Sequence, residues 1–182
     1  MASEIIVNTI KAPTTGANAN KVIIPSGVTL DASAGTLTCP TGFVVNTARE
    51  STISDVSTAG SSFNTIWTFN YTPVLSNSKV FFTHCLNLRG FNGGGHDGRF
   101  RYRVSIAGVT ALDVNDAGGY DYGGNGIWLR AIYSETLEYT NTSGSSFQWS
   151  LQVTAPNSSG VRFNEPSSAS PVSTCLIQEI AQ

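Results

Sequence analysis

Two glycine-rich segments carry the residue types best suited to contacting a ligand, RGFNGGGHDG at 89–98 and NDAGGYDYGGNG at 115–126. Glycine permits tight loop backbones, aromatic rings offer flat amphipathic surfaces, and carboxylate and amide groups form hydrogen bonds. This combination suits sugars, which present both apolar ring faces and hydroxyl groups. The alternative is that both segments are solvated hairpin loops in which glycine serves only turn geometry. The candidate binding residues are Arg89, Phe91, Asn92, His96, Asp97, Tyr120, Asp121, Tyr122 and Asn125.

The same segments do not match phosphate or metal sites. A phosphate loop opens a helix, whereas strands are expected after both segments and neither contains GxxxxGK. The stretch DVNDAG, starting at Asp113, begins like a calcium loop, but Ala117 and Gly124 stand where oxygen ligands are required. His84 and His96 lack the nearby His or Cys of a zinc site. We therefore expect no cofactor and no metal, leaving open a site built from single residues around a three-fold axis.

Catalytic patterns are also missing from the sequence. No GxSxG motif occurs, and a hydrolytic triad would have to use one of only two histidines. Glu135 and Glu138 are spaced like a carboxylate pair of a glycosidase, but a solvated edge in a short strand and turn is the ordinary interpretation. The row Arg99, Arg101 and Arg103 favours a solvated or subunit-facing strand face over an anion site. We expect no enzymatic activity.

Alternating apolar residues predict the elements that would hold the glycine-rich segments. In 63–71, Phe63, Thr65, Trp67, Phe69 and Tyr71 are expected on one face of a strand. In 99–107, every second residue from Phe100 to Ile106 is apolar, and the arginines alternate with them. Further strands are expected at 79–88, 108–114, 126–133, 147–154, 161–163 and 173–181. No window shows a capped helical period, so residues 50–182 are predicted to form an all-β, antiparallel β-sandwich of jelly-roll type.

Residues 1–49 have a different pattern. EIIVNTI (4–10) and the segment 21–45 are short extended pieces separated by glycines, and each offers too few apolar residues to close a core. We expect an N-terminal β arm or stem, intertwined with two other copies in a parallel homotrimer. The alternative is a meandering arm that lies on another protein. The residues expected to serve attachment and trimerisation are Ile5, Ile6, Val7, Ile10, Val22, Ile23, Ile24, Leu30 and Leu37.

Composition excludes several classes of partner. The formal net charge is −2 and the pI is about 5.6, which disfavours binding to nucleic acid or to an anionic membrane surface. No apolar run approaches the roughly 18 residues of a membrane span, and the start of the sequence does not look like a signal peptide. Three widely spaced cysteines favour synthesis in a reducing cytosol, with all three thiols buried or half-buried.

Several short stretches carry a family resemblance. LNLRG (86–90), RFRYRV (99–104), SSFQWSLQV (145–153), VRFN (161–164) and STCLIQEIAQ (173–182) resemble the C-terminal domain of bacteriophage tail fibre and virion structural proteins, especially those of marine and cyanobacterial phages. Residues 3–37 look like the leading segment of such fibres. The resemblance implies a homotrimer whose N-terminus attaches to other virion or baseplate proteins and whose β-sandwich head contacts a glycan of the host surface.

Two further possibilities come from other functional classes. The chain could be a purely structural virion component, such as a head-decoration or baseplate scaffold protein, because almost no shaft separates the expected stem from the head. It could also be an intracellular carbohydrate-binding module, although such a module needs no N-terminal arm. Exposure of the glycine-rich loops at the free end of the particle distinguishes a receptor-binding protein from the structural component.

Overall fold

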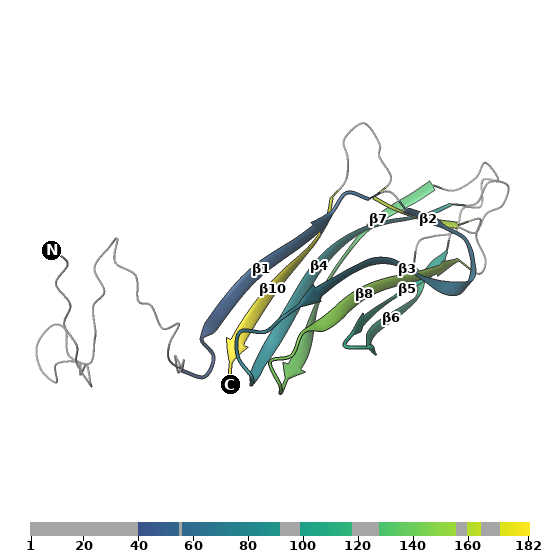
Figure 1. Ribbon diagram of the computed structural model, residues 1–182. Coiled ribbons are helices and arrows are strands. Elements are labelled where there is room, and N and C mark those ends of the chain that lie inside the picture. Colours follow the sequence, from purple (N-terminus) through teal and green to yellow (C-terminus); the bar gives the residue numbers. More distant parts are fainter. Residues whose placement is uncertain (1–39, 55, 92–98, 118–127, 156–159, 165–171) are drawn as a thin grey trace, which may run out of the picture. The chain divides into compact units, whose positions relative to one another are not determined.

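The computed structural model describes residues 40–54, 56–91, 99–117, 128–155, 160–164 and 172–182, with backbone only for Phe91 and 128–131. Within these ranges the chain contains strands and no helix, as the sequence predicted (Figure 1). The strands are β1 (Val44–Thr52), β2 (Val56–Thr58), β3 (Gly60–Tyr71), β4 (Ser78–Phe91), β5 (Phe100–Ile106), β6 (Val109–Ala117), β7 (Trp128–Asn141), β8 (Phe147–Ala155), β9 (Gly160–Phe163) and β10 (Ser173–Ala181).

The eight long strands form two antiparallel sheets packed face to face. The first sheet has the order β1-β10-β4-β7, with the short strands β9 and β2 continuing from one end of β4, and the second has the order β3-β8-β5-β6. The long strands pair in a nested way, β1 with β10, β3 with β8, β4 with β7 and β5 with β6. This nesting is the connectivity of a jelly roll, which confirms the predicted all-β sandwich.

Alternation along the strands fills the space between the two sheets. In β5, Phe100, Tyr102, Val104 and Ile106 are all buried, and the intervening arginines face outward, as predicted. Aromatic rings dominate the centre of the core, where Trp149 stacks on Phe69 with ring centroids 4.9 Å apart. Burial of such rings is the main favourable contribution to folding of a sandwich of this size.

The predicted common face of residues 63–71 is wrong because β3 contains a bulge. Thr65 is opposite Gln152 of β8 whereas Trp67 is opposite Leu151, so one extra residue, Ile66, lies between them. Since a shift of one residue moves the preceding side chains to the other face, Phe63 and Thr65 lie on the outer face while Trp67 points inward. The arginine above Phe63 shows this, because the Arg103 guanidinium lies 4.1 Å from the Phe63 ring centroid.

Two expected boundaries also differ from the structure. The strand expected at 126–133 continues as β7 to Asn141, because it pairs with the whole length of β4. The compact unit spans Cys39–Gln182, and β1 crosses the expected boundary at residues 49 and 50. Val44 and Val45, which we assigned to the stem, therefore belong to the sandwich. Residues 1–39, including all the predicted attachment residues from Ile5 to Leu37, lie outside the described residues.

Two smaller findings concern the thiols and membranes. Cys175 is buried and Cys85 is half-buried, and both are free, as expected, while Cys39 lies outside the described residues. Burial raises the pKa of the Cys175 thiol to about 12, with a smaller contribution from the charge of Glu50.

In the part of the chain that the structure describes, no helix has the length and apolarity needed to cross a membrane.

Candidate functional site

The strand ends that flank the two glycine-rich segments lie together at one end of the sandwich. Phe91, the last residue of β4, is opposite Trp128, the first residue of β7, and Phe100, which starts β5, is opposite Ala117, which ends β6. We call this end the loop end; it lies at the right of Figure 1. The chain enters the sandwich at the other end, where Gly42 donates a hydrogen bond to the carbonyl of Ala181.

A row of arginines crosses the first sheet at the loop end. Arg89 of β4 is opposite Arg130 of β7 on one side and Arg162 of β9 on the other. Arg89 and Arg162 are both half-buried and each takes part in an interaction within the chain. Like charges directly opposite on neighbouring strands are unfavourable unless anionic groups are close. The register therefore places three arginine positions next to one another at the end of the sheet where β4 ends and β7 begins.

Of the predicted binding residues, Arg89 is described with its side chain and Phe91 with its backbone. Both lie in the last three residues of β4, so the structure brings them to the same end of the sheet. The remaining seven candidates lie outside the described residues: Asn92, His96, Asp97, Tyr120, Asp121, Tyr122 and Asn125. Their role stays a prediction.

The two glutamates weighed as a glycosidase pair point to opposite faces of β7. Glu135 is opposite the buried His84, whereas Glu138 is opposite Phe81 and forms a surface ion pair with Lys79. Side chains three apart in a strand lie on different faces, so these carboxylates cannot flank one bond of a substrate. The predicted solvated edge is wrong for Glu135, which lies on the inner face.

Glu135 instead joins the two sheets through a polar network. Its carboxylate accepts hydrogen bonds from the Tyr102 hydroxyl and from the Nε2 atom of His84, both at 2.8 Å. Burial lowers the pKa of His84 despite the opposing effect of Glu135, and burial raises the pKa of Tyr102. The imidazole is therefore neutral near pH 7, and we interpret the network as a structural link between β4, β5 and β7.

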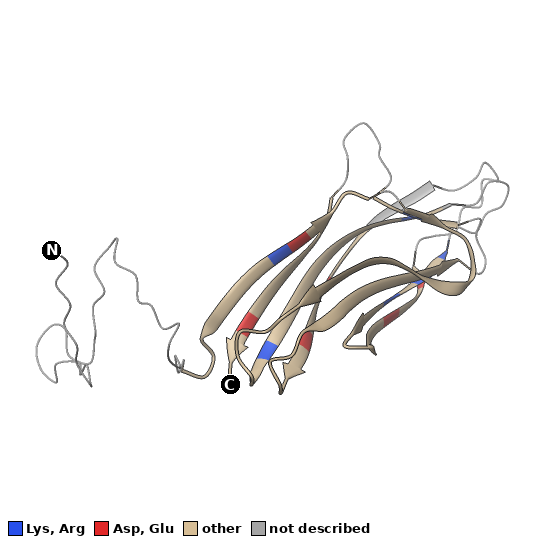
Figure 2. Ribbon diagram, in the orientation of Figure 1, with Lys and Arg blue, Asp and Glu red and all other residues tan. Residues whose placement is uncertain are grey.

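The outer face of the second sheet carries a mixed polar and aromatic surface. Arg103 lies over Phe63 and bonds to the side-chain oxygen of Gln152, while Arg101 pairs with Asp113 at 3.3 Å. Asp113, the first residue of the stretch that begins like a calcium loop, lies in the extended strand β6. The ligands of a calcium loop lie instead on a backbone that curves around the ion. The charged residues of the described part of the sandwich are distributed over several strands (Figure 2).

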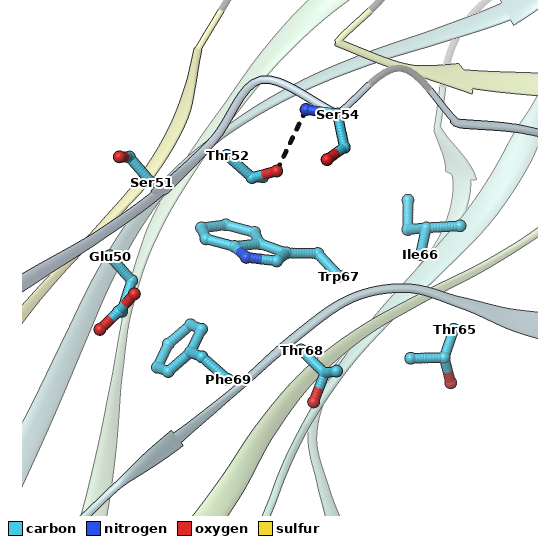
Figure 3. A pocket seen from close by; sticks show the side chains of 9 residues that line it. All are labelled: Glu50, Ser51, Thr52, Ser54, Thr65, Ile66, Trp67, Thr68 and Phe69. Carbon is cyan, nitrogen blue, oxygen red and sulfur yellow. Dashed lines mark hydrogen bonds between the residues drawn. The ribbon is translucent and has the colours of Figure 1, made fainter.

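A groove of about 470 Å³ opens between β1 and β3, the edge strands of the two sheets (Figure 3). The aromatic rings of Trp67 and Phe69 lie in it, and Glu50 extends toward them from β1. It is lined by Glu50, Ser51, Thr52, Ser54, Thr65, Ile66, Trp67, Thr68 and Phe69. Sequence reasoning missed this groove because β1 was assigned to the stem. In addition, the alternation of residue types in 63–71 does not indicate the bulge at Ile66.

These features define the chain as a jelly-roll β-sandwich with a row of arginine positions at the end where the strands flanking the two glycine-rich segments end or begin. No protein-family model matches the sequence, and no curated protein matches it. Among solved structures it is similar to the VP2 subviral particle of infectious bursal disease virus, at 14% identity and a TM-score of 0.25, over 87% of this chain and 43% of that chain. The Gx strain of the same virus gives 15% identity and a TM-score of 0.26, over 87% and 45%. The chain thus spans less than half the length of these viral proteins.

Proposed function

We propose that this chain is a bacteriophage virion protein, a short tail fibre or baseplate-tip protein, whose sandwich contacts the host cell. The observation that supports this best is the position of the strand ends around the glycine-rich segments. They lie at the opposite end of the sandwich from Pro40 and Gly42, where the chain enters. A domain held by its N-terminal side presents its opposite end to the outside, so these segments would face the host.

The proposed ligand is a glycan of the host surface. The aromatic residues of the predicted site, Phe91, Tyr120 and Tyr122, suit sugar rings. The arginine row at Arg89, Arg130 and Arg162 favours a glycan that carries carboxylate or phosphate groups, because guanidinium groups bind both in a bidentate manner. Individually weak contacts of this kind become effective when several copies act together.

We further propose that the copies are supplied by a homotrimer. The outer face of the first sheet supports self-association, because Leu176 of β10 and Ile132 of β7 are exposed there, at 38% and 68%. Beside Leu176, the side chains of Thr83 and Thr136 bond to each other at 2.9 Å, which adds uncharged polar surface to this part of the face. A trimer has a native mass three times the 19.2 kDa of the chain, and a native mass of one chain would contradict it.

The proposed role is binding without catalysis and without a cofactor. The opposite orientation of Glu135 and Glu138 supports this, since it separates the carboxylates that sequence spacing had paired. Purified protein should release no reducing ends from host-envelope polysaccharide. Release that is abolished by Glu135→Gln would contradict the proposal.

The deciding experiment replaces Tyr120 and Tyr122 by alanine in the phage and measures adsorption together with the amount of the protein in the particles. We expect reduced adsorption at normal incorporation. A matched control is Thr142→Ala, which changes an exposed residue in the turn after β7, at the end where the chain enters. Normal adsorption at normal incorporation would remove the tyrosines from the site. Impaired incorporation with unaltered adsorption would instead favour a purely structural virion component.

A further inference from the structure

We propose that the groove between β1 and β3 binds an uncharged sugar ring. This site is separate from the loop end, and the inference does not depend on the assignment to a virion. It is supported by the position of the groove in the fold, by polar side chains that have no partner within the described chain, and by the negative charge of Glu50 in its lining.

The groove exists because two sheet edges meet without covering each other. Among the described strands, β1 pairs only with β10 and β3 only with β8, so each has one edge on which no other described strand pairs. The bulge at Ile66 twists β3 and turns Trp67 inward, beneath Thr52 of β1 (Figure 3). The resulting volume of about 470 Å³ falls within the range of small-ligand sites, roughly 300–1,000 Å³.

The lining keeps both a hydrogen-bond acceptor and a donor available. Within the described residues the carboxylate of Glu50 makes no hydrogen bond or ion pair, and the indole N–H of Trp67 has no acceptor. Other groups are already engaged, because the Thr68 hydroxyl donates to the carbonyl of Trp149 and the Thr65 hydroxyl accepts from Gln152. A sugar has vicinal hydroxyls that can donate to the carboxylate and accept from the indole.

Apolar contact comes from the aromatic side of the groove. Trp67 and Phe69 have ring centroids 5.6 Å apart and present adjoining aromatic surface. Trp67 retains 8% exposure, and Phe69 is half-buried, so both are fixed by the core yet reachable from the groove. A sugar ring can place its C–H face on this surface while its hydroxyls meet Glu50 and Ser54.

The charge of the groove selects among sugars. Among the described residues that line the groove, Glu50 is the one that carries a charge, so a uronate or another anionic sugar would be repelled. Accordingly, the expected ligand is a neutral hexose or N-acetylhexosamine unit. This preference is opposite to that of the arginine row at the loop end, which allows the two sites to be told apart with the same purified protein.

The test is a titration of the full-length, ¹⁵N-labelled chain followed through its tryptophan indole N–H signals. The probes are maltotriose, chitotriose and tri-galacturonate, and Trp67→Phe assigns the signal of Trp67. We expect maltotriose or chitotriose to shift the Trp67 signal and tri-galacturonate to shift it much less. Glu50→Gln should weaken binding of the neutral sugar about tenfold, because a charged acceptor is lost, and should narrow the difference between neutral and anionic probes.

The control is Glu138→Gln, which removes a half-exposed carboxylate on the outer face of the same sheet and should leave the titration unchanged. Sharp, dispersed indole signals from the other tryptophans show that each variant is folded, and in Trp67→Phe a shift of the Trp149 signal is expected because the centroids of the two rings lie 5.0 Å apart. The proposal is overturned if neither neutral sugar moves the Trp67 signal at about 50 mM. It is equally overturned if Glu50→Gln and wild type bind alike, or if tri-galacturonate binds better than the neutral sugars.

Discussion

The buried carboxylate of Glu179 should be one of the most sensitive positions of the sandwich. It lies in β10 with no exposed surface and accepts three hydrogen bonds, from the Tyr71 hydroxyl at 3.0 Å and from the backbone N–H groups of Val74 and Leu75 at 2.8 and 2.9 Å. These bonds attach the connection between β3 and β4 to the last strand. Replacing Glu179 by glutamine keeps the shape but turns one acceptor oxygen into a donor.

The magnitude follows from the bonds that the amide cannot form. One backbone N–H of the connection would face an NH₂ group, and a buried donor without a partner costs about 1–3 kcal/mol. The remaining bonds lose the charge of the acceptor, and hydrogen bonds to charged groups contribute roughly 1.5–3 kcal/mol each. Relief of the desolvation cost of the carboxylate offsets part of this loss. We therefore expect Glu179→Gln to lower the free energy of unfolding by about 2–4 kcal/mol.

Urea unfolding of the full-length chain, followed by tryptophan fluorescence, measures this change directly, because Trp149 is fully buried in the core. The midpoint should fall while the dependence on urea concentration stays the same. Glu138→Gln is the matched control, since its ion pair with Lys79 is exposed and is expected to contribute at most about 1 kcal/mol. A loss below about 0.5 kcal/mol for Glu179→Gln would refute the assigned role of the three bonds.

Three further predictions concern the core and its titratable groups. Iodoacetamide should modify Cys85 well before Cys175 in the folded chain, because burial raises the pKa of Cys175 to about 12. The rates are measured from labelled peptides, and equal rates at the two thiols would contradict the burial of Cys175. Burial likewise raises the pKa of Tyr71 to about 12, so the unfolded chain ionises first and stability falls as the pH rises from about 10 toward 12. Tyr71→Phe should make that fall shallower in unfolding experiments at pH 9 to 11, roughly the range of tyrosine ionisation. Leu151→Ala should cost about 2–5 kcal/mol, whereas Ile132→Ala, at an exposed position, should stay within about 0.5 kcal/mol for the sandwich itself.

The sequence predicted the fold well wherever alternation was uninterrupted. The run from Phe100 to Ile106 gave the correct strand and the correct faces, because one side packs on the core and the other meets solvent. The same rule failed for Phe63 and Thr65, since a bulge shifts the alternation of inward and outward side chains by one residue. The residue types near Ile66 do not indicate where such a bulge occurs.

Other features depend on contacts far apart in the chain. Glu179 and His84 are polar residues that a sequence places on the surface, yet each is buried because its partners come from distant strands. The arginine row arises from the register of three strands. The sequence alone could not show that Arg130 and Arg162 lie opposite Arg89. The groove could be predicted only if β1 was assigned to the sandwich, and the low apolar content of that strand did not suggest this assignment.

The central claim is that the sandwich contacts the host cell, and a competition experiment tests it most directly. Cells of the proposed host are incubated with the purified full-length chain before the phage proposed to carry it is added, and the fraction of adsorbed phage is measured. We predict a saturable, concentration-dependent loss of adsorption, which is weaker for the chain with Tyr120→Ala and Tyr122→Ala. Adsorption that stays constant while the cells bind none of the purified chain would contradict the claim.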